Sequence, residues 1–215
     1  MDSLAPTRRP RADAERNRRR VVDAATRVFA EHGSNATLND VAREAGVGVG
    51  TVYRKFADKE AMLDALFDEK VDTMVALAER AATTSDAGEA VRLLLFSLME
   101  KRASDRGLDA ILGSPDRGMR FSDELSRRFL PTVELLVSRA IAAAEVRPGF
   151  SADEVCLLAF MVGKVADITR ASDPEVWRRY AQLLVDGTRP TPEAAPLTPA
   201  ALSFADSALA LGRAN

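Results

Sequence analysis

The sequence predicts an all-α fold, and three observations support this prediction. Apolar residues recur at helical spacing along most of the 215 residues. Proline and glycine fall mainly between these periodic segments. The alternation of β-branched and polar residues that is typical of strands is nearly absent. With 47% hydrophobic residues, the chain can bury a sizeable core as one long domain or two small ones.

The N-terminal part of the chain, up to residue 58, predicts a helix-turn-helix. Residues 1–12 are expected to be a disordered arm, and a first helix runs from about 13 to 33. Thr37 is the expected N-cap of a second helix, 38–45, because its hydroxyl can accept an orphan backbone N–H. A third helix is expected to start near Gly48 and to end before Asp58.

The rest of the chain predicts further helices. A fourth helix starts at Asp58, and a fifth is opened by the capping-box pair Asp86 and Glu89 and runs to about 103. A short segment at 105–112 and a loop or single turn at 116–121 follow. Next we expect a helix at 122–145, capped by Ser122 and kinked or divided at Pro131, and a helix to 169 opened by Ser151 and Glu154. The last expectations are a helix to 186 opened by Asp173 and Pro174, a linker at 188–199, and a weak helix or disorder from 200 to 211.

These elements group into four predicted parts. They are the basic arm at 1–12, the helix-turn-helix domain at 13–58, a helical domain at 59–187, and a proline-rich linker and tail at 188–215.

The composition excludes several classes of protein. Collagen, low-complexity chains and disulfide scaffolds do not fit. The single cysteine, Cys156, cannot pair within the chain, and no apolar run reaches the roughly 18 to 20 residues that span a bilayer. No apolar signal-peptide core is visible. We therefore expect a cytoplasmic protein without a membrane partner. A single histidine, His32, makes a His-rich metal site or a Ser-His-Asp triad hard to build.

The charge is unevenly distributed. The net charge of −2 divides into +3 for residues 1–60 and −5 for residues 61–215, and residues 8–20 contain seven arginines. A basic arm beside a compact domain suits binding to phosphates or entry into the minor groove of DNA. The alternative is a disordered terminus that only keeps the chain in solution.

Residues 38–56, LNDVAREAGVGVGTVYRKF, carry the functional signal. Two short helices flank a tight turn at 46–48, where Gly46 can adopt the left-handed conformation. Ala42 is small where the two helices would cross, and Val47 and Val52 are apolar where the inner face would be. The second helix of such a motif enters the major groove, so the sequence predicts DNA binding.

The motifs AATRVFAEHG (24–33), TLNDVAREAGV (37–47) and GTVYRKFADKE (50–60) resemble the DNA-binding domain of the tetracycline-repressor (TetR) family over residues 15–67. The resemblance implies an all-helical second domain for ligand binding and dimerisation. It also implies phosphate contacts from Thr37, Tyr53 and Lys59, base-edge positions at Asn39, Val49, Gly50, Thr51 and Arg54, and a position close to phosphate for Lys55.

Several of these assignments have structural alternatives. Tyr53 could be a half-buried helix residue, Lys59 an ordinary solvated lysine, and Arg54 a ligand of phosphate alone. The chain also departs from the family at Gly48, where serine is common. Glycine caps a helix less well by a few tenths of a kcal/mol and offers no side-chain contact.

A helix-turn-helix that reads a palindrome needs two copies, so the second domain is expected to form a homodimer. Small residues that a partner helix could approach recur at Ala159, Gly163 and Ala166, and the next helix offers Trp177, Tyr180, Leu183 and Leu184 as large partners. The alternative is that these faces pack within one chain. The resemblance also implies a small-molecule effector, for which we expect an apolar pocket at Phe96, Met99, Ile111, Met119, Phe121, Phe129 and Val133; core packing explains each of these residues equally well.

The resulting hypothesis is a ligand-responsive repressor that binds a palindromic operator as a homodimer, without cofactor or metal. The alternative is a helix-turn-helix adaptor or an activator that works through protein partners. Enzyme activity is not expected, because no phosphate loop, metal-ligand cluster or nucleophile–base constellation is visible.

Overall fold

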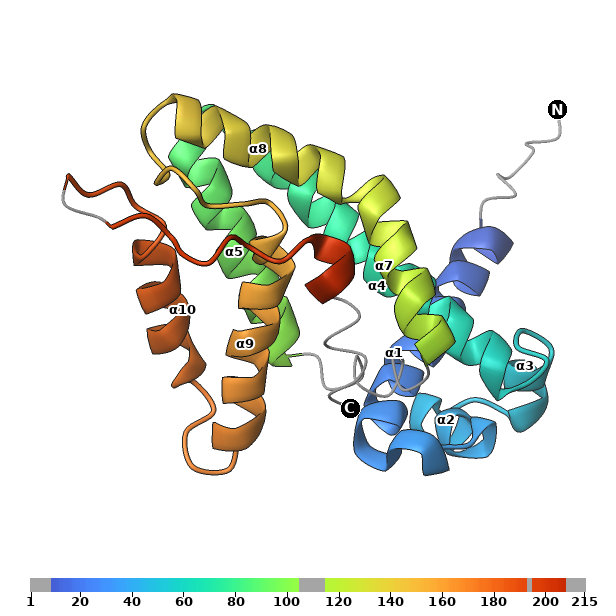
Figure 1. The fold of residues 1–215 in the computed structure, drawn as a ribbon. Helices are drawn as coiled ribbons and strands as arrows, with labels where there is room; N and C mark the ends of the chain where they lie inside the picture. Colours follow the sequence, from blue (N-terminus) through green and yellow to red (C-terminus); the bar gives the residue numbers. More distant parts are fainter. Residues whose placement is uncertain (1–8, 105–114, 193–194, 208–215) are drawn as a thin grey trace, which may run out of the picture. The chain divides into compact units, whose positions relative to one another are not determined.

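The computed structural model describes residues 9–104, 115–192 and 195–207, and every regular element in these ranges is a helix (Figure 1). The predicted all-α fold is confirmed. The chain forms two compact units, Met1–Phe67 and Asp68–Asn215, and the division falls within α4 (Lys59–Ala82). Within the described ranges, no helix is both long and apolar enough to cross a membrane.

The first unit contains α1 (Arg9–His32), a 3-10 turn (Gly33–Asn35), α2 (Leu38–Ala45), α3 (Val49–Tyr53) and the start of α4. Its core is built from side chains on all four helices: Val21, Ala25, Phe29, Leu38, Val41, Val52, Met62 and Leu66. Within each longer helix these positions recur at helical spacing, which places them on its inner face.

The start of α1 differs from the prediction. The helix begins at Arg9, whereas the sequence predicted disorder to residue 12. Pro10 is the second residue of this helix, in the first turn, where a backbone N–H has no partner within the helix in any case. Proline therefore does not prevent the helix from forming here. Residues 1–8 of the predicted arm lie outside the described residues.

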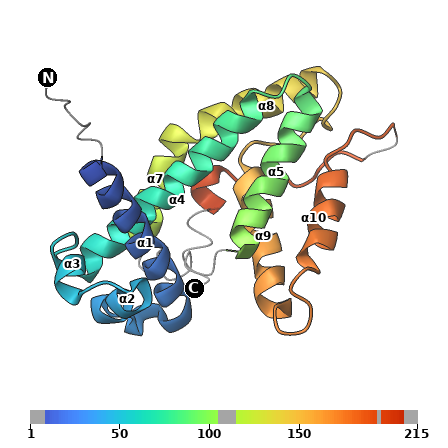
Figure 2. The ribbon, with the colours of Figure 1, turned by 180° about the vertical axis from the view of Figure 1, so that it is seen from behind.

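The second unit contains the rest of α4, α5 (Ala87–Ser104), α7 (Pro115–Arg128), α8 (Leu130–Ala142), α9 (Glu154–Thr169) and α10 (Trp177–Asp186). In both views α5 lies alongside α9 and α8 (Figures 1 and 2). Leu94, Leu95 and Met99 on α5 are almost completely buried. An ion pair of 2.6 Å between Arg128 and Asp72 joins α7 to α4.

The predicted helix at 122–145 is two helices. α7 ends at Arg128 and α8 starts at Leu130, so the helix is divided next to Pro131. Of the two predicted outcomes, a kink or a division, the structure shows the division. Proline in the first turn of α8 loses no helical hydrogen bond. The loop predicted at 116–121 is wrong, because α7 already begins at Pro115. Ser122 is consequently buried inside α7 and does not cap it. The predicted segment at 105–112 lies outside the described residues.

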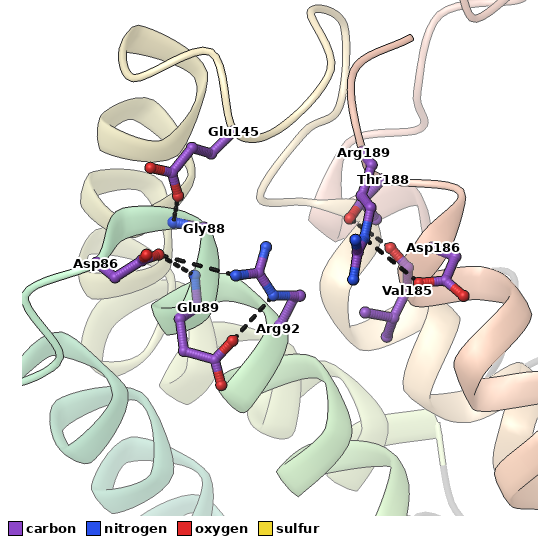
Figure 3. A network of polar contacts seen from close by, with 9 residues as sticks. All are labelled: Asp86, Gly88, Glu89, Arg92, Glu145, Val185, Asp186, Thr188 and Arg189. Atoms are coloured by element: carbon purple, nitrogen blue, oxygen red, sulfur yellow. Dashed lines mark hydrogen bonds and ion pairs between the residues drawn. The ribbon is translucent and has the colours of Figure 1, made fainter.

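The start of α5 is held by two carboxylates (Figure 3). Asp86 accepts the backbone N–H of Glu89 at 2.7 Å, and Glu145 accepts the N–H of Gly88 at 2.7 Å. The bond from Glu89 lowers the pKa of Asp86 below its usual value. Asp86 therefore caps α5, as predicted. The second half of the predicted capping box would need Glu89 to bind the backbone at Asp86, but the Glu89 carboxylate accepts a hydrogen bond from Arg92 at 3.0 Å.

The last helix and the tail also differ in detail from the prediction. α10 starts at Trp177 and not at Pro174, since residues 174–176 form a turn in which the Asp173 side chain accepts the N–H of Glu175. Beyond α10 the chain returns along the second unit, where Arg147 donates to the carbonyl of Ala195 at 2.6 Å. A single helical turn at 204–207 buries Phe204, whose N–H donates to Asp153 at 2.8 Å. The described part of the tail, 195–207, therefore contacts the rest of the second unit at Ala195 and Phe204.

Candidate nucleic-acid interface

Thr37 caps α2 as predicted, and Asp40 completes the cap. The Thr37 hydroxyl accepts the N–H of Asp40 at 3.2 Å, and the Asp40 carboxylate accepts the N–H of Thr37 at 3.1 Å. The same hydroxyl donates to Asp40 at 2.6 Å. This bond lowers the pKa of the Asp40 carboxyl below its usual value. In the DNA-free chain the hydroxyl proton of Thr37 is therefore directed to Asp40.

The turn between α2 and α3 requires glycine at one position. Gly46 has a φ of +64°, in the left-handed region that favours glycine. Its N–H caps the end of α2 by donating to the carbonyls of Ala42 and Arg43. Ala42 is buried where the helices cross, and Val47 is half-buried. The geometry of the motif is as predicted.

The α3 helix has one buried side and one exposed side. Val52 is completely buried, whereas Val49 is 43% exposed and Tyr53 is 49% exposed. Large apolar and aromatic side chains that face solvent from a short, well-anchored helix indicate a contact surface. Gly50 adds to it, because a Cβ at that position would meet no atom within 4 Å. The exposed side of α3 is thus available to a partner that approaches closely.

Polar groups surround this exposed side. Arg54, directly after α3, donates to the hydroxyl of Thr51 at 3.2 Å. Asn39 and Lys55 are exposed, and the ammonium of Lys59 lies 5.5 Å from the ring centre of Phe29. We call the nine residues Thr37, Asn39, Val49, Gly50, Thr51, Tyr53, Arg54, Lys55 and Lys59 the α2–α3 surface.

Gly48 occupies the N-cap of α3 with φ −63° and ψ 139°, a conformation open to any residue. A Cβ at this position would lie 4.0 Å from the Thr51 hydroxyl, its nearest neighbour. The serine that the TetR resemblance leads one to expect would therefore fit, and its absence leaves α3 without a side-chain cap.

Two residues lie outside this surface and have structural roles. His32 ends α1, where a basic side chain suits the helix dipole. Cys156 lies on α9, and burial raises the pKa of its thiol to about 12. The thiol therefore stays protonated at neutral pH, as expected for a packing residue rather than a redox sensor.

The residues predicted for an effector pocket do not behave as one set. Met99, Phe129 and Val133 are completely buried and belong to the core of the second unit. Phe96 and Phe121 are half-buried. Met119 is 57% exposed, and Ile111 lies outside the described residues.

The small residues predicted for dimerisation face the interior of the chain. Ala159, Gly163 and Ala166 are buried within the protomer, and a Cβ at Gly163 would overlap the side chain of Arg102 on α5. Trp177 is also buried, whereas Tyr180 is 45% exposed and Leu184 is half-buried. Periodicity identified the apolar stripe but not the helix that covers it.

The sequence reasoning missed several residues. Asp40 was not recognised as part of the α2 cap, although the spacing Thr37-x-x-Asp40 is that of a capping box. On α9, Met161 and Ile168 are 48% and 81% exposed, on the side opposite the buried stripe. They lie seven residues apart, a spacing that places them on one helix face.

Comparisons with known proteins agree with this geometry. The family model for bacterial regulatory proteins of the tetR family matches residues 21–66. An HTH-type transcriptional regulator of Staphylococcus aureus is 36% identical over 66 residues, which is 30% of this chain and 36% of that protein. The chain thus matches about a third of the length of this curated relative.

Two solved structures share the architecture over most of the chain. FadR of Bacillus subtilis, solved in complex with stearoyl-CoA, is 21% identical with a TM-score of 0.61, and the alignment covers 79% of this chain and 98% of FadR. The TetR transcription regulatory protein from Mycobacterium vanbaalenii is 30% identical with a TM-score of 0.62, and the alignment covers 84% of this chain and 99% of that protein. The chain belongs to the tetR family of bacterial transcriptional regulators.

Proposed function

We propose that this regulator is a homodimeric repressor that binds a palindromic DNA operator and is released from it by a small apolar or amphipathic effector. The observation that carries the proposal is the two-sided α3 helix. Val52 anchors the helix in the core, and Val49 and Tyr53 project into solvent from the other side. A major groove about 12 Å wide admits one such helix, so each protomer reads one half-site.

The α2–α3 surface divides into two roles under this proposal. Thr37, Tyr53, Lys55 and Lys59 bind phosphates. Val49, Thr51 and Arg54 reach base edges, where Arg54 binds guanine O6 and N7 and the methyl groups contact thymine. Asn39 and Gly50 border the same bases. Because the Thr37 hydroxyl donates to Asp40 in the DNA-free chain, it must turn away from Asp40 to reach a phosphate.

The homodimer is proposed to form through the outward faces of α9 and α10. Met161 and Ile168 on α9 and Tyr180 and Leu183 on α10 are between 45% and 81% exposed. The buried stripes of both helices are already covered within the chain. A second copy of the same chain would remove these large apolar side chains from water.

The effector is proposed to bind within the second unit beside Phe96 and Phe121, the half-buried members of the predicted pocket. A known ligand complex supports an apolar or amphipathic ligand: FadR of the same fold was solved with stearoyl-CoA. Release follows from a population shift, in which the ligand favours a dimer geometry that spaces the two α3 helices wrongly for the operator.

Variants of the α2–α3 surface test the proposal. Tyr53→Phe and Lys59→Ala are expected to weaken binding about equally for all DNA sequences, because they remove phosphate contacts. Arg54→Ala is expected to relax one position of the site at a cost of about 1–3 kcal/mol. Arg80→Ala, an exposed change on α4, is the control.

DNA affinity that none of the three variants alters would refute the assignment of this surface. The chain would then fit an adaptor that works through protein partners. Operator affinity that no compound alters, across a panel that includes acyl-CoA thioesters, would contradict the effector part alone.

A further inference from the structure

The segment that the family model matches has a net negative charge, although DNA-binding domains usually present positive charge to DNA. Residues 21–66 contain five Lys or Arg and seven Asp or Glu, a net charge of −2. Duplex DNA carries one negative charge per about 1.7 Å of its axis, and much of the affinity of its binding proteins comes from cations that displace counterions. Arg54, Lys55 and Lys59 supply positive charge next to α3. The net charge of residues 21–66 is nevertheless negative, so this segment as a whole does not attract DNA.

The missing charge lies immediately before the matched domain. Residues 16–20 carry four arginines and no carboxylate; we call Arg16, Arg18, Arg19 and Arg20 the arginine segment. All four side chains are exposed. The segment raises the net charge of residues 16–66 to +2, so the sign of the domain depends on it.

The structure fixes this segment in space. It belongs to α1, a continuous helix whose later residues Val21, Ala25 and Phe29 are buried in the first unit. The Arg20 guanidinium donates to the carbonyl of Ala45 at 2.9 Å, at the end of α2. It also lies 3.7 Å from the position that a Cβ of Gly46 would take. The arginine segment is therefore anchored beside the turn that leads into α3.

The other three arginines precede Arg20 within about one turn of the same helix. With a rise of 1.5 Å per residue, Arg16 is displaced by about 6 Å along the helix axis from Arg20. The Debye length at 0.15 M salt is about 8 Å, so the field of the whole segment extends to the duplex that the turn approaches. Guanidinium groups also bind phosphate oxygens in a bidentate manner.

We propose that Arg16, Arg18 and Arg19 form a second DNA contact, to backbone phosphates flanking the half-site. This contact supplies most of the salt-dependent, sequence-independent affinity, and the α2–α3 surface supplies the sequence preference. The inference rests on the proposed DNA binding but assigns the electrostatic affinity to residues that precede the segment matched by the family model.

The experiment measures DNA affinity as a function of salt. Fluorescence anisotropy with an operator duplex and a scrambled duplex, between roughly 50 and 300 mM salt, gives the slope of log K against log salt for each. The test variant is R16A/R18A/R19A. The control R80A/R127A/R189A removes three exposed arginines of the second unit and makes the same change in net charge. R16K/R18K/R19K keeps the charge of the arginine segment.

Each lost phosphate contact makes the slope shallower by about 0.9, so a dimer that loses six arginines is expected to lose up to about five units of slope on both duplexes. The ratio of operator to scrambled affinity should stay that of the native protein, and the lysine variant should restore most of the slope. Because alanine favours helix, the circular dichroism spectrum should not change.

Equal slopes for R16A/R18A/R19A and the control would overturn the inference. So would a loss of sequence preference with no change in slope. A native protein without preference for the operator would instead refute the proposed function, and the slopes on scrambled DNA would still decide whether the arginine segment binds phosphates.

Discussion

Gly163 on α9 lies so close to Arg102 on α5 that a Cβ at position 163 would overlap Cγ of Arg102. The Arg102 side chain is buried, and its guanidinium pairs with Asp167 at 3.1 Å. The guanidinium carbon also lies 5.7 Å from the ring centre of Phe160. The small residue on α9 therefore makes room for a buried arginine of the same chain rather than for a partner helix.

Gly163→Ala is consequently expected to destabilise the protomer. Overpacking costs about 1–3 kcal/mol, which exceeds the gain in helix propensity of at most about 1 kcal/mol. Urea unfolding should show a lower midpoint with an unchanged slope. If Gly163→Ala instead disrupted the dimer and left the stability of the protomer intact, the intramolecular packing of Gly163 against Arg102 would be wrong.

Gly50→Ala provides the matched comparison on α3. A Cβ there meets no atom within 4 Å, so the free protein should gain about 0.5–1 kcal/mol of stability. DNA affinity should nevertheless fall, because the added methyl group occupies space that the bases need under the proposed docking. Thermal melts and operator titrations of the same preparation test both effects. Higher stability with unchanged affinity would place the DNA away from Gly50.

The α2 cap predicts a pH-dependent stability. The pKa of Asp40 is lowered in the folded chain, first by the hydrogen bond from Thr37, so its ionised form stabilises the fold. This contribution is present above the unfolded pKa of about 3.9 and is lost as the pH falls through the lower folded value. The difference in melting temperature between the native protein and Asp40→Asn should therefore shrink below about pH 4.

The Thr37→Ala background sharpens this test. Without the hydroxyl, the Asp40→Asn change should have a smaller effect at pH 7, since the two side chains form one cap. A melting-temperature difference that stays constant down to pH 2, or that is additive with Thr37→Ala, would contradict the coupling.

The tail is expected to detach before the rest of the second unit unfolds. Residues 195–203 are exposed, and the contacts that hold this stretch include those of Phe204 with Asp153 and of Arg147 with Ala195. Phe204→Ala should therefore accelerate proteolysis between 195 and 207 while the helices up to α10 stay protected. Leu202→Ala, at a side chain that is 53% exposed, is the control and should leave the rate unchanged. Equal proteolysis rates for the two variants would show that Phe204 does not hold the tail.

The sequence predicted the motif in detail because its signals are local. Thr37 as N-cap, Gly46 in the turn and Ala42 at the crossing each follow from residues within a few positions of one another. Pro131 likewise divided the predicted long helix. By contrast, Gly163 indicated only that one face of its helix carries small residues. Its neighbour Arg102 is 61 residues away, and no local pattern encodes which helix will cover a stripe.

The tail illustrates the same limit. A proline-rich stretch with Phe204 near its end is compatible with disorder or with docking. The choice depends on Asp153, which is placed by the fold 51 residues earlier in the chain.

The central claim is that the α2–α3 surface reads a palindromic operator, and selection of bound genomic fragments by the purified regulator tests it most directly. The selection is best made at about 150 mM salt, where binding by phosphate contacts alone is weakened. The account predicts an enriched palindrome whose half-sites lie one helical turn, or a multiple of it, apart. When the Arg54→Ala variant makes the selection, the base preference at one position of each half-site should disappear. Fragments enriched without a common site, or a site that Arg54→Ala selects unchanged, would contradict it.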